Sequence, residues 1–104
     1  MTKKTDNVDI ENLIFLGRLY DWRLIDFNAK KRVVILKRKG CRLSIKYDKM
    51  NVVSCMNHPK YGTTCLLRRN VDMNLFEDIL YNPRVHTELG KSISPFKAKK
   101  IYCL

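Results

Sequence analysis

The most chemically varied stretch of the chain is the segment 57–64, which reads Asn-His-Pro-Lys-Tyr-Gly-Thr-Thr. Lys60 can contact a phosphate, Tyr61 can stack on a base, and Gly62 allows another backbone to approach closely. Arg68 and Arg69 follow soon after, and a guanidinium matches a phosphate with paired hydrogen bonds. These residue types in this order predict contacts with nucleic acid.

Two cysteines and two histidines could in principle supply a zinc site: Cys55, His58, Cys65 and His86. Cys55 and His58 have a spacing that zinc sites use. Cys65 and His86 have no close partner in the sequence, however, and structural zinc sites usually combine two close pairs. Because Cys55 and Cys65 also lie in apolar segments, where a free cysteine packs as a small hydrophobic side chain, we expect free thiols and no metal or cofactor.

A metal-dependent nuclease would need clustered carboxylates or a histidine beside an acid. Asp72, Glu77 and Asp78 fall on the outward side of a predicted helix, and neither histidine has a carboxylate near it in the sequence. The four glycines are scattered singly, which excludes a glycine-rich nucleotide-binding loop. We therefore expect a protein that is not an enzyme, and keep a nuclease as the least favoured alternative.

The positive charge is concentrated in the middle of the chain. Of the net charge of +11, residues 30–69 carry all of the excess, because twelve lysines and arginines stand there against Asp48 alone. The segments on either side nearly balance, at −1 for 1–29 and +1 for 70–104. A like-charged cluster repels itself, and an anionic partner relieves that repulsion. The segregation therefore predicts a polyanion as partner.

A tight hairpin positions much of this charge. Residues 32–38 and 41–47 are strand-like, and Lys39-Gly40 between them suits a two-residue turn. That turn pairs Lys37 with Arg42 and places Lys46 on the same side, away from the apolar side chains of both strands. Directly opposed like charges destabilise a sheet. These cations have two interpretations. They form a phosphate-binding face, or they form a solvent-exposed face whose basic side chains only keep the protein soluble.

The remaining elements follow from periodicity and turn residues. Apolar residues at helical spacing predict a helix over 9–19, and Gly17 could end or bend it. Strands are expected over 22–27, 52–56 and 63–68. A second helix follows, capped by Asn70 or Asp72 and stopped at Asn82-Pro83.

These elements predict an α+β fold in which an antiparallel β-meander of about five strands is flanked by an N-terminal and a C-terminal helix. Both helices should cover one face and leave the other open. We expect a disordered N-terminus over 1–8, a single domain over 9–83 and a basic C-terminal extension over 84–104, with 92–100 a mobile arm. The apolar runs are too short to cross a bilayer and no signal peptide is present, which predicts an intracellular protein without membrane contact.

The favoured function is a nucleic-acid-binding module, for DNA or RNA, that grips phosphates with a basic sheet face and the 57–64 loop. Tyr47, like Tyr61, is a candidate for base stacking. A small adaptor or inhibitor that binds an acidic protein surface is the main alternative, with Tyr20, Trp22 or Phe27 as its apolar anchor. An uncovered edge strand leaves open a homodimer as well as a monomer. The predicted nucleic-acid-binding residues are Lys37, Arg38, Arg42, Lys46, Lys60, Tyr61, Arg68 and Arg69.

Overall fold

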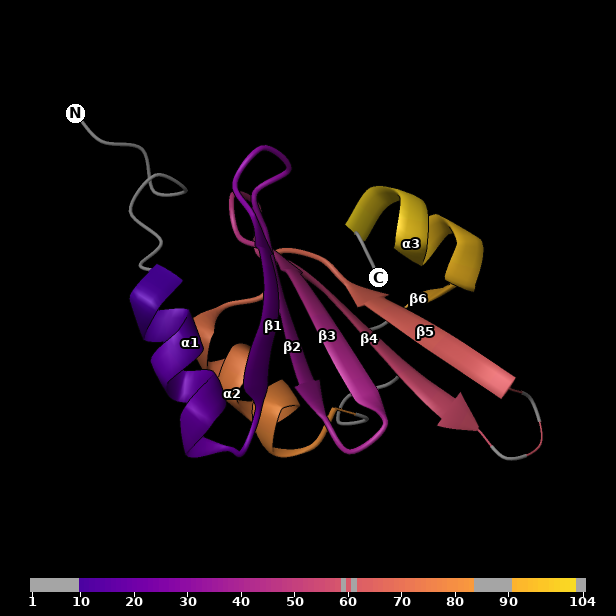
Figure 1. Ribbon diagram of the computed structural model, residues 1–104, viewed down its shortest axis with the longest axis horizontal. Coiled ribbons are helices and arrows are strands. Elements are labelled where there is room, and N and C mark those ends of the chain that lie inside the picture. Colours follow the sequence, from indigo (N-terminus) through magenta and orange to yellow (C-terminus); the bar gives the residue numbers. More distant parts are fainter. Residues whose placement is uncertain (1–9, 59, 61, 84–90, 103–104) are drawn as a thin grey trace.

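The computed structural model describes residues 10–58, 60, 62–83 and 91–102. Within these residues six strands form one antiparallel sheet whose spatial order follows the chain (Figure 1). The strands are β1 (Arg23–Asn28), β2 (Val33–Arg38), β3 (Cys41–Lys46), β4 (Asn51–His58), β5 (Gly62–Arg68) and β6 (Lys91–Ile93). The helices are α1 (Ile10–Leu19), α2 (Met73–Tyr81) and α3 (Pro95–Tyr102). The α+β class and the antiparallel meander are therefore confirmed.

The β2–β3 hairpin has the predicted register. Lys37 lies opposite Arg42, and Arg38 opposite Cys41. Both turn residues adopt positive φ angles, 39° at Lys39 and 75° at Gly40. That combination belongs to the tight turn whose twist matches the flanking strands. The turn thereby fixes which side chains of β2 and β3 share a face.

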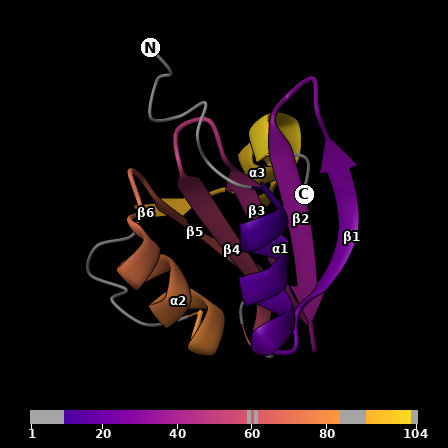
Figure 2. The same cartoon turned by 90° about the vertical axis from the view of Figure 1, so that its left-hand side faces the viewer.

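One face of the sheet carries the larger hydrophobic core. Val34 and Leu36 of β2 and Leu43 and Ile45 of β3 are buried there beneath α1 and α2. Figure 2 shows both helices in front of the strands. Helix α2 begins where the sequence predicts, because the Asp72 side chain accepts a hydrogen bond from the Leu75 backbone N–H at 2.8 Å and caps it.

Helix α1 does not end at Gly17 but continues to Leu19. Gly17 is buried, and a Cβ atom at this position would lie 2.9 Å from Leu36 Cδ1. The missing side chain thus allows the helix to pack closely against β2. This close approach accounts for a residue that is otherwise unfavourable inside a helix.

The second face of the sheet is covered by α3, which differs from the expected open face and mobile arm. Residues 91–93 pair with β5 as strand β6, and α3 then packs against β3, β4 and β5 on the face of the sheet opposite α1 and α2 (Figure 2). Ala98 and Tyr102 of α3 are buried in a second core with Val53 and Leu67. The Ser44 hydroxyl donates a hydrogen bond to the Tyr102 carbonyl oxygen. Part of the basic extension is therefore an integral layer of the fold.

Strands β1 and β6 form the two edges of the sheet. Pairing of two copies through an edge strand stays a prediction. Within the described part of the chain, none of the helices has the length and apolar character needed to span a bilayer.

Candidate nucleic-acid interface

Three of the predicted cations share the face that α3 covers in part. Lys37 lies opposite Arg42 in the β2–β3 ladder, and Lys46 lies opposite Val33 at the other end of the ladder, all three on the side away from α1 and α2. Arg42 is exposed, and Lys37 and Lys46 are partly buried. Helix α3 lies between the Lys37–Arg42 pair and Lys46, so a helix divides this basic surface of the sheet.

Arg38 holds a structural position, and its contact with phosphate stays a prediction. Its guanidinium donates hydrogen bonds to the carbonyl oxygens of Tyr20 at 2.9 Å and Leu80 at 2.8 Å. The Arg38 guanidinium carbon also lies 4.7 Å from the centroid of the Trp22 ring. Because α1 and α2 both end here, this one cation satisfies carbonyl groups that helix ends leave unpaired. Arg38 therefore ties the two helices to β2.

Arg68 is buried, so it lies outside the surface on which the sequence placed it. Only 1% of the residue is exposed, and its guanidinium donates to the Pro83 carbonyl oxygen at 2.9 Å and to Ser54 Oγ at 3.4 Å. Burial lowers the pKa of the Arg68 guanidinium from its ordinary value, while the electrostatic interaction with Cys41 acts in the opposite direction. We assign Arg68 to the anchoring of the chain that follows α2.

The remaining predicted residues lie at opposite ends of β5. Lys60 is at the tip of the β4–β5 hairpin and Arg69 follows the far end of β5, so the length of β5, roughly 20 Å at the rise of an extended strand, separates them. Both are exposed. Tyr61 lies outside the described residues. The 57–64 segment is also shorter as a loop than predicted, because β4 extends to His58 and β5 begins at Gly62.

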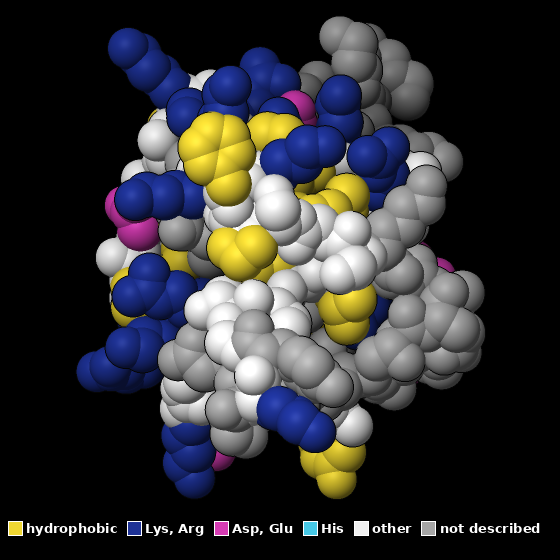
Figure 3. Space-filling model, turned by 90° about the vertical axis from the view of Figure 1, so that its right-hand side faces the viewer, with side chains coloured by type: hydrophobic (Ala, Val, Ile, Leu, Met, Phe, Trp, Pro, Cys, Tyr) yellow, Lys and Arg dark blue, Asp and Glu magenta, His cyan; other side chains and the backbone are white. Residues whose placement is uncertain are grey.

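A basic hollow of about 420 Å³ opens where the β1–β2 turn, the end of β3 and the last turn of α3 meet. Its described lining combines five cations, one carboxylate and one apolar residue: Lys30, Lys31, Arg32, Lys46, Lys100, Asp48 and Ile101. Asp48 Oδ2 lies 3.7 Å from an Arg32 guanidinium nitrogen, so it offsets only part of the charge. From the side that carries α3 and β6, lysines and arginines gather along the upper and left margins around exposed apolar side chains (Figure 3).

Helix α3 adds functional candidates that the sequence reasoning missed. Lys97, Lys99 and Lys100 are exposed on it, and Phe96 is 73% exposed beside them. A signal for this helix was present in the sequence. Ser94 precedes Pro95, and its side chain accepts the Lys97 backbone N–H at 3.2 Å, the pattern of a capped helix that starts with proline.

The aromatic residues proposed for stacking and docking divide between the surface and the core. Tyr47 packs against the core on the α1–α2 side and stacks on Phe27, with ring centroids 6.2 Å apart, so it does not share a face with the predicted cations. Trp22 is only 1% exposed and donates from Nε1 to the Leu80 carbonyl oxygen at 2.8 Å. Phe27 is 45% exposed and Tyr20 is partly buried.

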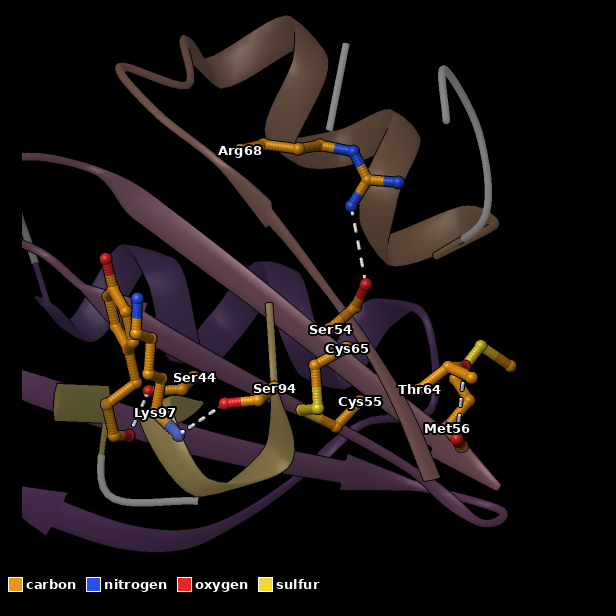
Figure 4. The surroundings of a disulfide bond; sticks show 10 residues. Ser44, Ser54, Cys55, Met56, Thr64, Cys65, Arg68, Ser94 and Lys97 are labelled. Atoms are coloured by element: carbon orange, nitrogen blue, oxygen red, sulfur yellow. Dashed lines mark hydrogen bonds between the residues drawn. A yellow bond between two sulfur atoms is a disulfide. The ribbon is translucent and has the colours of Figure 1, made fainter. Parts of the chain in front are cut away.

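The expectation of free thiols at Cys55 and Cys65 is wrong. The two residues lie directly opposite one another on β4 and β5, and a disulfide joins them (Figure 4). A bridged pair cannot supply the two thiolates of the zinc alternative. His86 lies outside the described residues, as does the side chain of His58. Among the side chains that the structure describes, no group of three or more His, Cys, Asp or Glu is placed to hold a metal ion.

Comparison with known proteins gives no further guide, since no family model, curated protein or solved structure matches this chain.

Proposed function

We propose that this protein is a non-enzymatic nucleic-acid-binding module that holds the sugar-phosphate backbone against the basic hollow. The observation that carries this proposal is the assembly of five cations around one hollow in the presence of a single carboxylate. A surface of this kind concentrates positive potential, and repeated phosphates are the anions that many closely spaced cations can neutralise together.

The cations of the hollow come from three separate parts of the chain. Lys30, Lys31 and Arg32 belong to the β1–β2 turn, Lys46 ends β3, and Lys100 lies on α3. Because the fold gathers them from distant positions, their proximity is not a consequence of a single basic run in the sequence. Arg42 and Lys37 continue the positive surface beyond the other end of α3. An extended polyanion could therefore contact both ends of the helix.

Aromatic exposure supports single-stranded nucleic acid as the first substrate to test. Phe96 projects from α3 among the lysines of that helix, and an exposed aromatic ring can stack on any base. Cationic grooves with adjacent stacking platforms are a recurring way to hold single strands without sequence preference.

Fluorescence anisotropy with labelled oligonucleotides, single-stranded and duplex, tests the proposal. Binding should weaken steeply between about 50 and 200 mM salt, and neutralisation of about five phosphates gives a log–log slope near −4.5 on duplex. The double substitution Lys46→Gln with Lys100→Gln should make that slope shallower by about 1.8. The matched control is Arg18→Gln with Lys39→Gln, which removes the same charge from exposed positions outside the hollow. The proposal would be contradicted if the protein did not bind oligonucleotides at low salt, or if the two double variants changed the salt slope equally.

An adaptor that docks on an acidic protein is the second candidate, and the same exposed Phe96 favours it. Docking interfaces need a buried apolar anchor as well as charge. Phe96 is 73% exposed and Ile101 is 45% exposed, both on α3 next to its lysines. A pull-down that retains an acidic protein after nuclease treatment, and loses it with Phe96→Ala, would favour the adaptor over the nucleic-acid-binding module.

A further inference from the structure

A single row of cross-strand neighbours places two cations next to the disulfide. Lys37 of β2 lies opposite Arg42 of β3, Arg42 lies opposite Cys55 of β4, and Cys55 lies opposite Cys65 of β5. Side chains that are directly opposite in an antiparallel sheet point to the same face, with Cβ atoms about 5 Å apart. The disulfide and the opposed cation pair are therefore adjacent parts of one surface.

The same row forms a second hollow of about 350 Å³, at the end of α3 opposite to the basic hollow. Its described lining holds two cations, both bridged cysteines and no carboxylate: Lys37, Gly40, Arg42, Cys55, Thr63, Cys65, Pro95 and Ala98. We call it the disulfide hollow. Its volume lies within the range of small-molecule sites. Figure 4 shows the bridge between β4 and β5, with Ser94 at the start of α3 nearby.

We propose that the disulfide hollow is a thiol–disulfide exchange site for low-molecular-weight thiols that carry a carboxylate or sulfonate group. Lys37 and Arg42 would bind the acid group and thereby hold the thiol against the bridge. The small thiolate should attack Sγ of Cys55, because Cys55 is 8% exposed while Cys65 is 1% exposed. This inference does not depend on nucleic-acid binding.

The exchange reduces the Cys55–Cys65 disulfide and oxidises two molecules of the small thiol, so it needs no other oxidant or reductant. The incoming thiolate forms a new S–S bond to Cys55 Sγ while the Cys55–Cys65 bond breaks. The electron pair of the broken bond leaves on Cys65 Sγ, which takes a proton from solvent. A second thiolate then attacks the outer sulfur of the mixed disulfide at Cys55, which releases the symmetrical small disulfide and leaves Cys55 as a thiolate. Neighbouring cations such as Arg42 stabilise a thiolate relative to its thiol.

The test measures the rate at which three small thiols open the bridge: mercaptoethanesulfonate, which is anionic, mercaptoethanol, which is neutral, and cysteamine, which is cationic. Each rate is divided by the rate of the same thiol with hydroxyethyl disulfide, which removes differences in intrinsic reactivity. We expect the normalised rate for the anionic thiol to exceed that for the cationic thiol by about tenfold at low salt. Acid quenching and peptide mass mapping should locate the mixed disulfide on Cys55.

Two variants and one control locate the effect. Lys37→Gln and Arg42→Gln should each reduce the preference for the anionic thiol by about threefold, and Lys49→Gln, a charge removal outside the disulfide hollow, should leave it unchanged. A thermal melt of each variant verifies that the fold persists. Equal normalised rates for the three thiols, an equal effect of Lys49→Gln, or modification mapped to Cys65 would overturn the proposal. Detection of four free thiols in the denatured, unreduced protein would also overturn it, because all four cysteines would then be unbridged.

Discussion

Arg38 and Trp22 donate to the same atom. The Arg38 guanidinium and the Trp22 indole Nε1 each lie 2.8 Å from the Leu80 carbonyl oxygen, and the guanidinium also stacks over the indole ring. The shared acceptor lies in the last turn of α2, while Arg38 ends β2 and Trp22 follows α1. One polar cluster therefore joins three elements that are distant in the sequence.

Replacement of Arg38 by lysine should destabilise the fold although it keeps the charge. Lysine has one side-chain nitrogen, so it cannot reach Tyr20 and Leu80 as Nη1 does and also donate to the Tyr81 carbonyl oxygen as Nη2 does at 3.3 Å, and it lacks the planar group that stacks over Trp22. The loss should be about 2 kcal/mol of unfolding free energy. Urea unfolding measures the change. Lys39→Arg, next to it in the exposed turn, is the control and should change stability by less than about 0.5 kcal/mol. Equal stability of the two variants would refute the structural assignment.

Arg68→Ala should lower stability without a change in the affinity of the folded protein for nucleic acid. Truncation leaves a cavity and an unsatisfied Pro83 carbonyl oxygen, at a cost of about 3 kcal/mol. The comparison is Lys46→Gln, which should weaken binding and leave the unfolding midpoint nearly unchanged. Binding measured well below the midpoint separates the two effects, and a loss of affinity in folded Arg68→Ala protein would return Arg68 to the interface.

The contrast between Arg38, Arg68 and Arg42 shows where sequence reasoning succeeded. Strict alternation in 41–47 and the Lys39-Gly40 turn placed Arg42 on the correct face, because a hairpin register is local information. Arg38 and Arg68 look equally basic in the sequence. Their burial depends on the ends of α1 and α2, which reach them only through tertiary packing.

The disulfide and α3 were missed for different reasons. Pairing of Cys55 with Cys65 requires the register of the β4–β5 hairpin, and a loop with several turn residues does not fix that register as a two-residue turn does. Helix α3 has a local start signal at Ser94-Pro95, but the four lysines of the segment 91–100, three of them in α3, suggested a solvated arm. Two apolar residues one turn apart, Ala98 and Tyr102, are enough to dock it.

Reduction of the Cys55–Cys65 bridge should lower the unfolding free energy by about 2–3 kcal/mol, since the cross-link closes a short loop in the unfolded chain. Urea unfolding with and without dithiothreitol measures the difference. The double variant Cys55→Ser with Cys65→Ser should lose the sensitivity to dithiothreitol. A wild-type protein that is equally stable in both conditions would contradict a bridge that constrains the fold.

Tyr102→Ala should detach α3 from the sheet. Tyr102 is 5% exposed in the second core, and truncation of a buried aromatic residue costs about 3–5 kcal/mol. This cost exceeds the free energy that holds a short peripheral helix on the sheet. Hydrogen exchange should then be faster in residues 95–102 and in β3, while α1 and α2 keep their protection. Phe96→Ala, at an exposed position of the same helix, is the matched control and should leave the exchange pattern unchanged. Unaltered protection of α3 in Tyr102→Ala would show that other contacts hold it.

Arg32→Gly should separate binding from stability at the basic hollow. Arg32 has a φ of 59°, a left-handed conformation that costs a residue with a side chain about 1–2 kcal/mol and costs glycine almost nothing. Glycine also increases the entropy of the unfolded chain, by about 0.5–1 kcal/mol, and the pair with Asp48, whose side chain is 18% exposed, is lost at a cost of about 1 kcal/mol, so the net stability should stay within about 1 kcal/mol of wild type. The substitution nevertheless removes one cation from the hollow, which should make the log–log salt slope on duplex shallower by about 0.9. Anisotropy titrations at several salt concentrations, together with urea unfolding, test both parts. Arg32→Lys retains the cation and should keep the wild-type slope. A shallower slope in the glycine variant alone would assign the effect to charge at this position. A wild-type slope in both variants would remove Arg32 from the interface.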